Sequence, residues 1–275
     1  MTFKVLQVNL HHSKAASASF CRTFTRGSYD VALIQEPWVN RGRIAGLADT
    51  KGKLIHCDSI KNMRTCVLVK HGTQCLPVSE LCSRDITTIE INWSRGSMRT
   101  LFLSSVYLPY DSRDPPPSQE LRLLVDRAQR GRHHLVVGCD ANAHSQLGWG
   151  STNTNPRGEA LLEYLISNNL EIANIGNQPT FENKNRREVI DITFCSFDFI
   201  NNIKDWNVKS EASLSDHKYI QFQMDAINHI APFRDPKRTN WVQYSEQLDA
   251  MTRSLAGRIA SWADMDQRAS SLKES

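Results

Sequence analysis

The segment HLVVGCDANAH (134–144) sets an apolar run of strand length directly before two polar residues, Asp140 and Asn142. The run lacks the 3.6-residue period of a helix, and a glycine, Gly138, closes it just ahead of the acid. A rigid strand aims its last side chains into a shared mouth, which a loop then completes. The segment therefore indicates a buried strand with a candidate site at its carboxyl end.

Short apolar runs of the same kind recur along the chain, with turn residues between them. They are rich in Val, Ile and Leu and have the length of strands. We expect strands at Phe3–Val8, Val31–Ile34, Cys66–Val69, Ile86–Ile91, Thr100–Tyr107, Leu135–Gly138, Val189–Phe194 and Tyr219–Phe222.

Helical patterns are fewer than strands. The clearest starts at Ser118 and ends at Gly131, and its apolar residues share one face. A second runs from about Gly158 to Asn169, and a weaker one spans Ser13–Thr25. Helices of this number would cover a sheet rather than form a bundle.

Several neighbouring strands are joined by connections too short for a helical crossover, as at Asn92–Arg99 and Phe181–Glu188. Such connections make hairpins, and hairpins among longer connections build a mixed sheet. The expected fold is a four-layered α/β sandwich, in which two packed mixed β-sheets are flanked by helices.

The composition, length and net charge limit the class to which the protein can belong. The 275 residues are 40% hydrophobic and 23% charged, which is close to the average for globular proteins and excludes disorder, collagen and coiled coil as whole-chain answers. The length favours one large domain with a tail. A net charge of +4 is too small to hold a polyanion by bulk charge, so any nucleic-acid binding must come from local patches.

Seven cysteines form no CxxC pair, and their odd number without a signal peptide indicates reduced thiols in a cytosolic or nuclear protein. No stretch approaches the length of a membrane span, so we expect a soluble intracellular protein without a membrane partner.

The pattern changes after residue 225. We expect one large domain at 1–225, a linker at 226–240, which contains APFRDPKRTN, and an amphipathic helical tail at 241–275. Such a tail either docks back on the domain or marks a chain cut from a longer polyprotein.

Polar residues at the predicted strand ends are the candidates for chemistry. Taken singly, a strand-terminal Asn or Asp is more often a turn former, and a Glu before Pro is usually solvated. An acid inside an apolar strand, as at Asp191, needs a partner. The ordered set is more specific than its members: Asn9, Glu36, Tyr107, Asp140, Asn142, Asp191, Asp216 and His217.

This set suits hydrolysis of a phosphodiester, which needs a Lewis acid, a base and donors for the charge that develops. Hard oxygen ligands such as Glu36 and Asn9 suit Mg²⁺. His217 could act as a base or as a cationic phosphate clamp, and Asp191 is the natural residue to orient its ring.

The motifs, in this order, resemble those of the exonuclease/endonuclease/phosphatase superfamily. More narrowly, residues 1–225 resemble the apurinic-type endonuclease domain at the front of the reverse-transcriptase polyprotein of non-LTR (LINE-like) retrotransposons. The motifs that carry the resemblance are QxN (Gln7–Asn9), QEP (Gln35–Pro37), SVYxPY (Ser105–Tyr110), GxDxNAH (Gly138–His144), RG before a Leu-rich helix (Arg157–Leu165), TF (Thr180-Phe181), IDIT (Ile190–Thr193) and SDH (Ser215–His217).

The resemblance implies a role for each matched residue. Glu36 would hold Mg²⁺, or Mn²⁺ in its place, with Asn9 beside it and Asp216 near the metal side. Tyr107 would donate to the scissile phosphate, Asp140 would position or deprotonate the water, and Asn142 would stabilise the transition state. His217, oriented by Asp191, would contact the phosphate, and Thr180 and Thr193 would lie near DNA.

One departure from the family pattern is GCDANAH, where most relatives have Gly-Asp-Phe-Asn. The pair Asp140 and Asn142 is kept, but the spacing from Gly138 grows by one residue. The departure concerns the geometry of the loop. His11, His12 and His144 are given no role, and surface or capping positions are the better interpretation of all three.

The implied function is a metal-dependent DNA endonuclease that nicks target DNA to prime reverse transcription during retrotransposition. Its partners would be double-stranded DNA and the reverse transcriptase domain of the same polyprotein, and it would act in the nucleus after synthesis in the cytoplasm. The alternatives are another phosphoesterase of the superfamily, such as a phosphatase, and a catalytically silent nucleic-acid-binding module. A silent module would have lost residues of the set, and all are present.

DNA contacts should come from basic loops: Asn40–Arg43, Ile60–Arg64, Ser94–Arg99 and Glu182–Arg187. The last is typical of a hairpin tip and is expected to join a strand that ends at Thr180 to the strand that carries Asp191. Lys184, Arg186 and Arg187 could then reach phosphates or a minor groove. A solvated basic turn is the alternative, because charged loops are commonly just surface.

Overall fold

The computed structural model describes residues 2–50, 52–95 and 97–225, and residues 242, 245, 246 and 249 of the tail. The predicted linker at 226–240 and nearly all of the predicted helical tail at 241–275 lie outside the described residues. The chain divides into two compact units, Met1–His229 and Ile230–Ser275, and both large sheets belong to the first unit.

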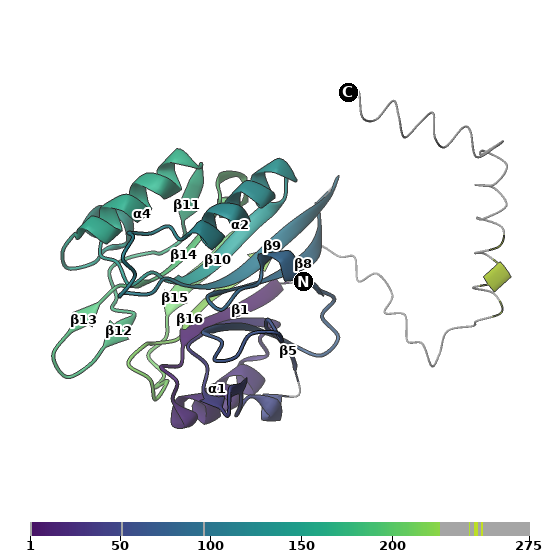
Figure 1. Cartoon of the computed structure of the whole chain (residues 1–275), viewed down its shortest axis with the longest axis horizontal. Helices are drawn as coiled ribbons and strands as arrows, with labels where there is room; N and C mark the ends of the chain where they lie inside the picture. The colour runs from purple at the N-terminus through teal and green to yellow at the C-terminus, as the bar shows by residue number, and fades with distance from the viewer. Residues whose placement is uncertain are drawn as a thin grey trace. The chain divides into compact units, whose positions relative to one another are not determined.

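Two mixed six-stranded sheets form the centre of the first unit (Figure 1). One sheet has the strand order β15 (Ile203–Val208), β16 (Ile220–Asp225), β1 (Thr2–Asn9), β2 (Val31–Gln35), β6 (Thr65–Val69) and β5 (Lys53–Ile55). The second has the order β11 (Leu170–Ile172), β14 (Asp191–Ser196), β10 (His134–Asp140), β9 (Ser97–Tyr107), β8 (Ile86–Arg95) and β7 (Leu76–Pro77). Within them β1 pairs with β2, and β9 with β10, in parallel, and the other pairs are antiparallel.

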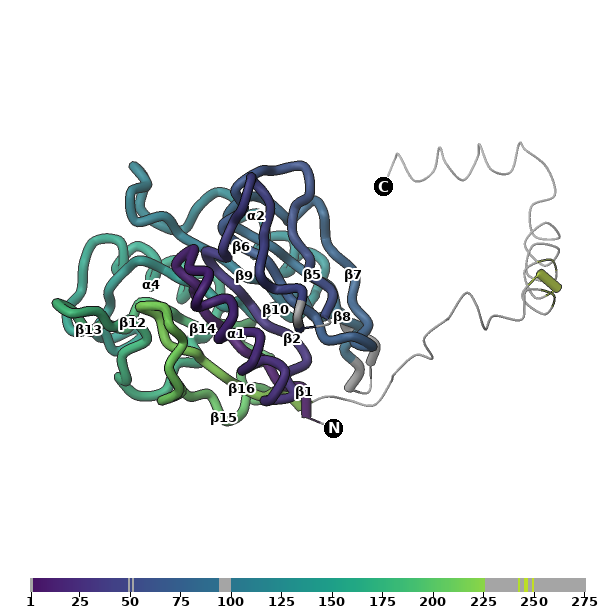
Figure 2. Tube along the Cα trace, turned by 90° about the horizontal axis from the view of Figure 1, so that it is seen from below, coloured from purple at the N-terminus to yellow at the C-terminus, as the bar shows by residue number. Residues whose placement is uncertain are grey.

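Helices cover the outer faces of both sheets, which makes the expected four layers. Helix α1 (Lys14–Gly27) packs on the first sheet, and α2 (Gln119–Arg130) and α4 (Pro156–Ser167) pack on the second (Figures 1 and 2). A third apolar cluster fills the space between the sheets. Shorter elements are α3 (Gln146–Trp149), the 3-10 helices η1 (Ala48–Thr50), η2 (Ser79–Leu81) and η3 (Phe197–Asn202), and two small hairpins, β3 (Val39–Asn40) with β4 (Arg43–Ile44) and β12 (Phe181–Glu182) with β13 (Arg187–Glu188).

Side-chain caps explain where the predicted helices begin. The Ser118 hydroxyl accepts from the amide of Leu121 at the start of α2, and Ser13 caps α1 in the same way. Asn155 accepts from the amide of Gly158, with Pro156 in the first turn, so α4 starts two residues earlier than the apolar pattern indicates.

Each of the eight predicted apolar runs contains a strand, and the two large sheets add four strands without a distinct apolar run, namely β5, β7, β11 and β15. Two predictions need correction. The predicted basic loop Ser94–Arg99 is largely strand, because β8 continues to Arg95 and pairs with β9 from Ser97 onward. No strand ends at Thr180; the hairpin of β12 and β13 starts at Phe181 and is separate from β14.

Buried glutamines fasten the two sheets together. Gln35 Nε2 donates to Ser105 Oγ and to the carbonyl of Gly138, both at 3.0 Å, and Gln7 Nε2 donates to the carbonyl of Ile192 at 3.2 Å. A Cβ at Gly138 would lie 2.8 Å from Gln7 Oε1. The motif glycine therefore allows the sheets to approach closely just below the strand ends that carry the candidate residues.

No helix in the described part of the chain has the length and apolar character of a membrane span. All seven cysteines lie among the described residues, and none of them forms a disulfide, as expected.

Candidate active site

The two sheets bring the candidate residues to one edge. Asn9 ends β1, and Glu36 follows β2, its parallel neighbour. In the second sheet Asp140 ends β10, directly opposite Tyr107 on β9 and Asp191 on β14. Strand pairing thus places residues from distant parts of the chain around Asp140.

Asn9 joins the two halves of the site. Its Nδ2 donates to Glu36 Oε2 at 3.0 Å and to Asp140 Oδ2 at 2.7 Å, and its Oδ1 accepts from the amide of His11 at 2.7 Å. In this arrangement the amide nitrogen faces the carboxylates. Asn9 therefore organises the two acids, and its predicted part as a metal ligand stays a prediction.

His12, given no role from the sequence, is the ionic partner of Glu36. Its Nε2 lies 3.3 Å from Glu36 Oε1, and Nδ1 lies 3.1 Å from the carbonyl oxygen of Pro37. Burial alone would raise the pKa of Glu36, but the hydrogen bonds from His12 and Asn9 outweigh it and lower that pKa to about 2. The Glu36 hydrogen bond in turn outweighs burial and raises the pKa of His12. Neither the segment NLHH (Asn9–His12) nor the motif QEP (Gln35–Pro37) indicates by itself that His12 pairs with Glu36.

The predicted pair of Asp191 and His217 is present. Nδ1 of His217 lies 2.9 Å from Asp191 Oδ2 and 3.1 Å from Oδ1, with both side chains buried. Burial opposes a charge on the imidazole, but the Asp191 carboxylate outweighs it and raises the pKa of His217 to about 9. The Phe181 ring packs edge-on against the imidazole with centroids 5.0 Å apart. His217 is therefore a buried cation with a fixed ring.

The neighbours of Asp140 shift its pKa in opposite directions. Burial, followed by the charge of Asp191, raises its pKa to about 7, although His217 and the Asn9 hydrogen bond act in the other direction. The amide of Asn142 donates to its Oδ1 at 3.2 Å. A carboxyl group with a pKa near neutrality can take or hold a proton at physiological pH.

Tyr107 lies beside the acids as a neutral phenol. Burial and the nearby charges of Glu36 and Asp140 raise its pKa, so it keeps its proton and remains a donor. The guanidinium of Arg64, paired with Asp85, stacks over the phenol ring at 4.8 Å. The sequence places Arg64 only in a basic loop, whereas the structure makes it a support of Tyr107.

The loop after Asp140 is held by the start of α4. Arg157 donates from Nε to the carbonyl of Asn142 at 3.1 Å and from Nη2 to that of Pro109 at 2.8 Å. A Cβ on Gly158 would lie 1.7 Å from the carbonyl oxygen of His144. These contacts explain the RG motif: Arg157 hydrogen-bonds the loop, and Gly158 allows α4 to pack closely against it.

Four site residues other than glycine have left-handed backbone: Glu36 (φ 43°), Asn142 (45°), His11 (46°) and His12 (52°). Each such residue costs of the order of 1–3 kcal/mol and persists only where surrounding contacts enforce it. Here the amide of His12 donates to the Glu36 carbonyl at 2.8 Å and the amide of Glu36 to the Arg64 carbonyl at 2.7 Å. Strain gathered at this edge is typical of a functional site.

The SDH motif is placed by its serine. Ser215 Oγ donates to the carbonyl of Asn9 at 2.9 Å and accepts from the amide of His217 at 3.2 Å. The Asp216 side chain is partly exposed, and its Oδ2 lies 3.7 Å from Nδ1 of His11. Its predicted place on the metal side stays a prediction.

The two threonines predicted near DNA are buried. Thr180 Oγ1 accepts from the amides of Ile190 and Asp191 and so fixes the start of β14. Thr193 lies between the sheets, where it donates to Gln7 Oε1 and accepts from Trp206 Nε1. Both hydroxyl groups support the site from within, and neither lies on the exposed surface.

The donor set suits a hard divalent cation. Glu36 is ionised throughout the physiological pH range, and Asn9 holds it close to Asp140. Asp140, Asp191 and His217 offer ligand atoms that all lie within 4.8 Å of one another. Because Nδ1 of His217 is already bonded to Asp191, carboxylate oxygens predominate, which favours Mg²⁺ over metals that prefer nitrogen or sulfur. A cation would also relieve the repulsion among these acids.

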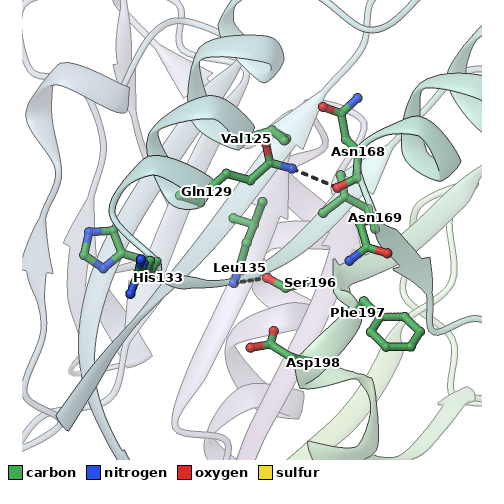
Figure 3. A pocket seen from close by; sticks show the side chains of 12 residues that line it. Val125, Gln129, His133, Leu135, Asn168, Asn169, Ser196, Phe197 and Asp198 are labelled. Atoms are coloured by element: carbon green, nitrogen blue, oxygen red, sulfur yellow. Dashed lines mark hydrogen bonds between the residues drawn. The ribbon is translucent and has the colours of Figure 1, made fainter. Parts of the chain in front are cut away.

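A separate cavity of about 370 Å³ opens at the opposite end of β10, around Leu135. Figure 3 shows Gln129 of α2 donating to the carbonyl of Asn168, and Ser196 accepting from the amide of Leu135, at its wall. It lies away from the converging strand ends, so we place the active site at Asp140 and not here.

Comparison with known proteins gives one family match over part of the chain. The sequence model of a family described as endonuclease-reverse transcriptase matches residues 101–221, which include Tyr107, Asp140, Asn142, Asp191 and His217. No curated protein matches the chain.

Solved structures share the fold. The chain is similar to the endonuclease domain of TRAS1, a telomere-specific non-LTR retrotransposon, with 27% identity and a TM-score of 0.68 over 82% of this chain and 100% of that one. An endonuclease/exonuclease/phosphatase family protein from Leptotrichia buccalis has 16% identity and a TM-score of 0.57, over 81% of this chain and 99% of that one. An AP endonuclease from Archaeoglobus fulgidus has 12% identity and a TM-score of 0.56, over 82% of this chain and 100% of that one.

Proposed function

We propose that this chain nicks double-stranded DNA with the help of Mg²⁺. The family match over residues 101–221 and the likeness to the TRAS1 domain support an endonuclease of the exonuclease/endonuclease/phosphatase superfamily, of the non-LTR type. The observation that carries the proposal is the position of Asp140. It is bonded through Asn9 to Glu36 on one side and lies opposite Asp191, the partner of His217, on the other.

Glu36 would hold the cation, and Mn²⁺ is the natural substitute. When bound, the cation supplies Lewis-acid stabilisation of charge on the phosphate. Asn9 keeps the Glu36 and Asp140 carboxylates together, and His12 keeps Glu36 ionised.

The remaining roles follow from protonation and position. Asp140, whose pKa lies near neutrality, orients the water and takes its proton. His217 stays protonated through its bond to Asp191 and faces the phosphate as a cation. The Tyr107 phenol and the side-chain amide of Asn142 donate to the developing charge.

DNA would lie across the strand ends, between basic segments. On the Glu36 side the loop Asn40–Arg43 adjoins Ile60–Arg64, because the amide of Asn62 donates to the carbonyl of Gly42 at 3.3 Å. On the other side lies the hairpin 181–188 with Lys184, Arg186 and Arg187. Phosphate contacts would supply affinity, and groove shape would supply preference.

In its biological setting we propose that the nick primes reverse transcription. The partner would be the reverse transcriptase domain of the same polyprotein, reached through residues 226–275, and the site of action would be nuclear DNA. The family name that matches residues 101–221 supports this coupling of endonuclease and reverse transcriptase.

The test is incubation of supercoiled plasmid with the protein and Mg²⁺ or EDTA, followed by gel analysis and mapping of the nicks. Nicking is expected only with the metal, and Glu36→Ala should abolish it while leaving circular dichroism unchanged. Full activity of the variant, or of wild type in EDTA, would overturn the metal assignment. Release of phosphate from p-nitrophenyl phosphate without nicking would favour the phosphatase alternative.

A further inference from the structure

The hairpin formed by β12 and β13 is too small to hold its own shape. Each strand has two residues, with Phe181 opposite Glu188 and Glu182 opposite Arg187. An isolated hairpin of this size has little stability in water. Its position relative to the active site must therefore come from contacts outside it.

One edge of the hairpin is bonded to the segment that carries His217. The amide of Glu182 donates to the carbonyl of Asp216 at 2.7 Å, and Lys218 Nζ lies 2.7 Å from Glu182 Oε2. Phe181 bridges to His217. Backbone pairing therefore fixes this edge of the hairpin.

The other edge meets the loop that follows Asn142. Glu188, which is 4% exposed, accepts from the amide and from the hydroxyl of Thr152. Arg186 donates from Nη2 to Nε2 of His144, whose Nδ1 lies against Asn153 Oδ1. An Nδ1–H donated to the Asn153 oxygen leaves the Nε2 lone pair for Arg186, so both contacts are satisfied by one tautomer.

His144 is itself rigidly placed. Its amide donates to Asn155 Oδ1 and its carbonyl accepts from the amide of Asn155, both at 3.1 Å. Gly158 packs against that same carbonyl oxygen. The ring is only 12% exposed and lies two residues after Asn142. His144 can thus transmit the position of the catalytic loop to the hairpin.

We propose that His144 is a positioning residue, which latches the hairpin 181–188 to the Asn142 loop and thereby sets where DNA is read relative to the scissile phosphate. The inference rests on the proposed endonuclease function. Of the three basic residues of the hairpin, Arg187 pairs with Glu182 and Arg186 with His144. His144 therefore decides the direction in which the Arg186 guanidinium points.

A histidine that only fills space would predict a different result. If His144 only filled space, its removal would lower the stability of the protein without changing the choice of nick site. A phenylalanine ring of similar shape would then restore the stability. The latch instead requires an acceptor atom at the place of Nε2.

The first test needs no DNA. Amide hydrogen exchange of the intact chain is measured by mass spectrometry for wild type, His144→Ala, and His71→Ala as a control at an exposed histidine. Exchange in peptides covering residues 181–188 should rise at least about threefold in His144→Ala only. Unchanged exchange there would overturn the latch, whatever the nuclease activity.

The second test maps nick positions on one plasmid for His144→Ala, His144→Phe, His144→Gln, Arg186→Ala and the double variant His144→Ala/Arg186→Ala. Loss of the acceptor in Ala and Phe should lower the preference for favoured sites by about three- to tenfold, and Gln should restore it in part. In the Arg186→Ala background, loss of His144 should add nothing further. Equal effects in both backgrounds, or a wild-type pattern in His144→Phe, would refute the latch. Failure of wild type to nick at all would instead refute the proposed function, and the exchange result would still decide the latch.

Discussion

Asp140 and His217 illustrate how one neighbouring carboxylate raises the pKa of two groups in one site. The acid is raised to about 7 by burial and by Asp191, whereas the imidazole is raised to about 9 against burial, because it bonds the same Asp191. Strongly perturbed pKa values of this kind cluster at functional sites. At the residue scale Asp191 therefore contributes to the raised pKa of both groups.

The replacement Asp191→Asn should move the alkaline limb of the pH profile. Activity of wild type should rise as Asp140 loses its proton and fall as His217 loses its proton near pH 9. Removing the Asp191 charge lowers the pKa of His217, so the falling limb should shift to lower pH. The measurement is kcat/KM for plasmid nicking against pH in Mg²⁺, with Asp126→Asn on α2 as control. A limb that stays in place would show that His217 does not need Asp191.

At the scale of elements, helix α4 and the hairpin 181–188 hold the catalytic loop from two directions. The helix does so through Arg157 and through close approach at Gly158. The hairpin does so through Arg186 and Glu188. The loop's left-handed Asn142 is thus maintained by packing of separate elements.

Gly158→Ala should disturb both fold and activity. The added methyl would lie 1.7 Å from a backbone oxygen, so α4 must shift, at a cost of about 1–3 kcal/mol. Denaturant unfolding should show this loss, and the nicking rate should fall because the Asn142 carbonyl loses its place on Arg157. Glu159→Ala, the next residue, is the control and should change neither. A variant of unchanged stability would mean that the loop yields easily.

Replacing Asn183–Arg187 by Gly and Ser tests the predicted DNA contact. If the hairpin reads DNA, the mapped nick positions should change while the total rate stays within about tenfold, because the catalytic side chains are untouched. An unchanged pattern would mean that specificity is set elsewhere and that the basic turn is only solvated surface. Replacing Arg41–Arg43 by Gly and Ser on the opposite flank separates a local effect from general loss of charge.

At the scale of the whole molecule, the two packed sheets act as one platform. Gln7 and Gln35 cross between them just beneath the site, so the Asn9 and Asp140 strand ends cannot move independently. The compact unit Met1–His229 contains every residue assigned to catalysis.

A fragment of residues 1–229 should therefore fold and nick by itself. It keeps both sheets and the loops that form the site, and domains with their own core fold alone. We expect one cooperative thermal transition and a nicking rate within about threefold of the full chain. An insoluble or inactive fragment would show that residues 230–275 belong to the folded nuclease.

The long strands, the helix caps and the acids, amide and histidine at the strand ends could all be predicted from the sequence alone. These are local properties: apolar runs report burial, and Ser118 or Asn155 satisfies amides within its own turn. The pair of Asp191 and His217 was also predictable, because a buried carboxylate requires a partner.

Which loops meet could be learned only from the folded molecule. His12 meets Glu36, Arg64 covers Tyr107, and His144 meets Arg186, because strand order brings together segments that the sequence keeps apart. The burial of Thr193 has the same origin, since its side chain faces the other sheet and bonds Gln7 and Trp206 there. Periodicity tells whether a residue is buried along its own element, but the partner across a sheet or loop depends on the order and direction in which the strands assemble.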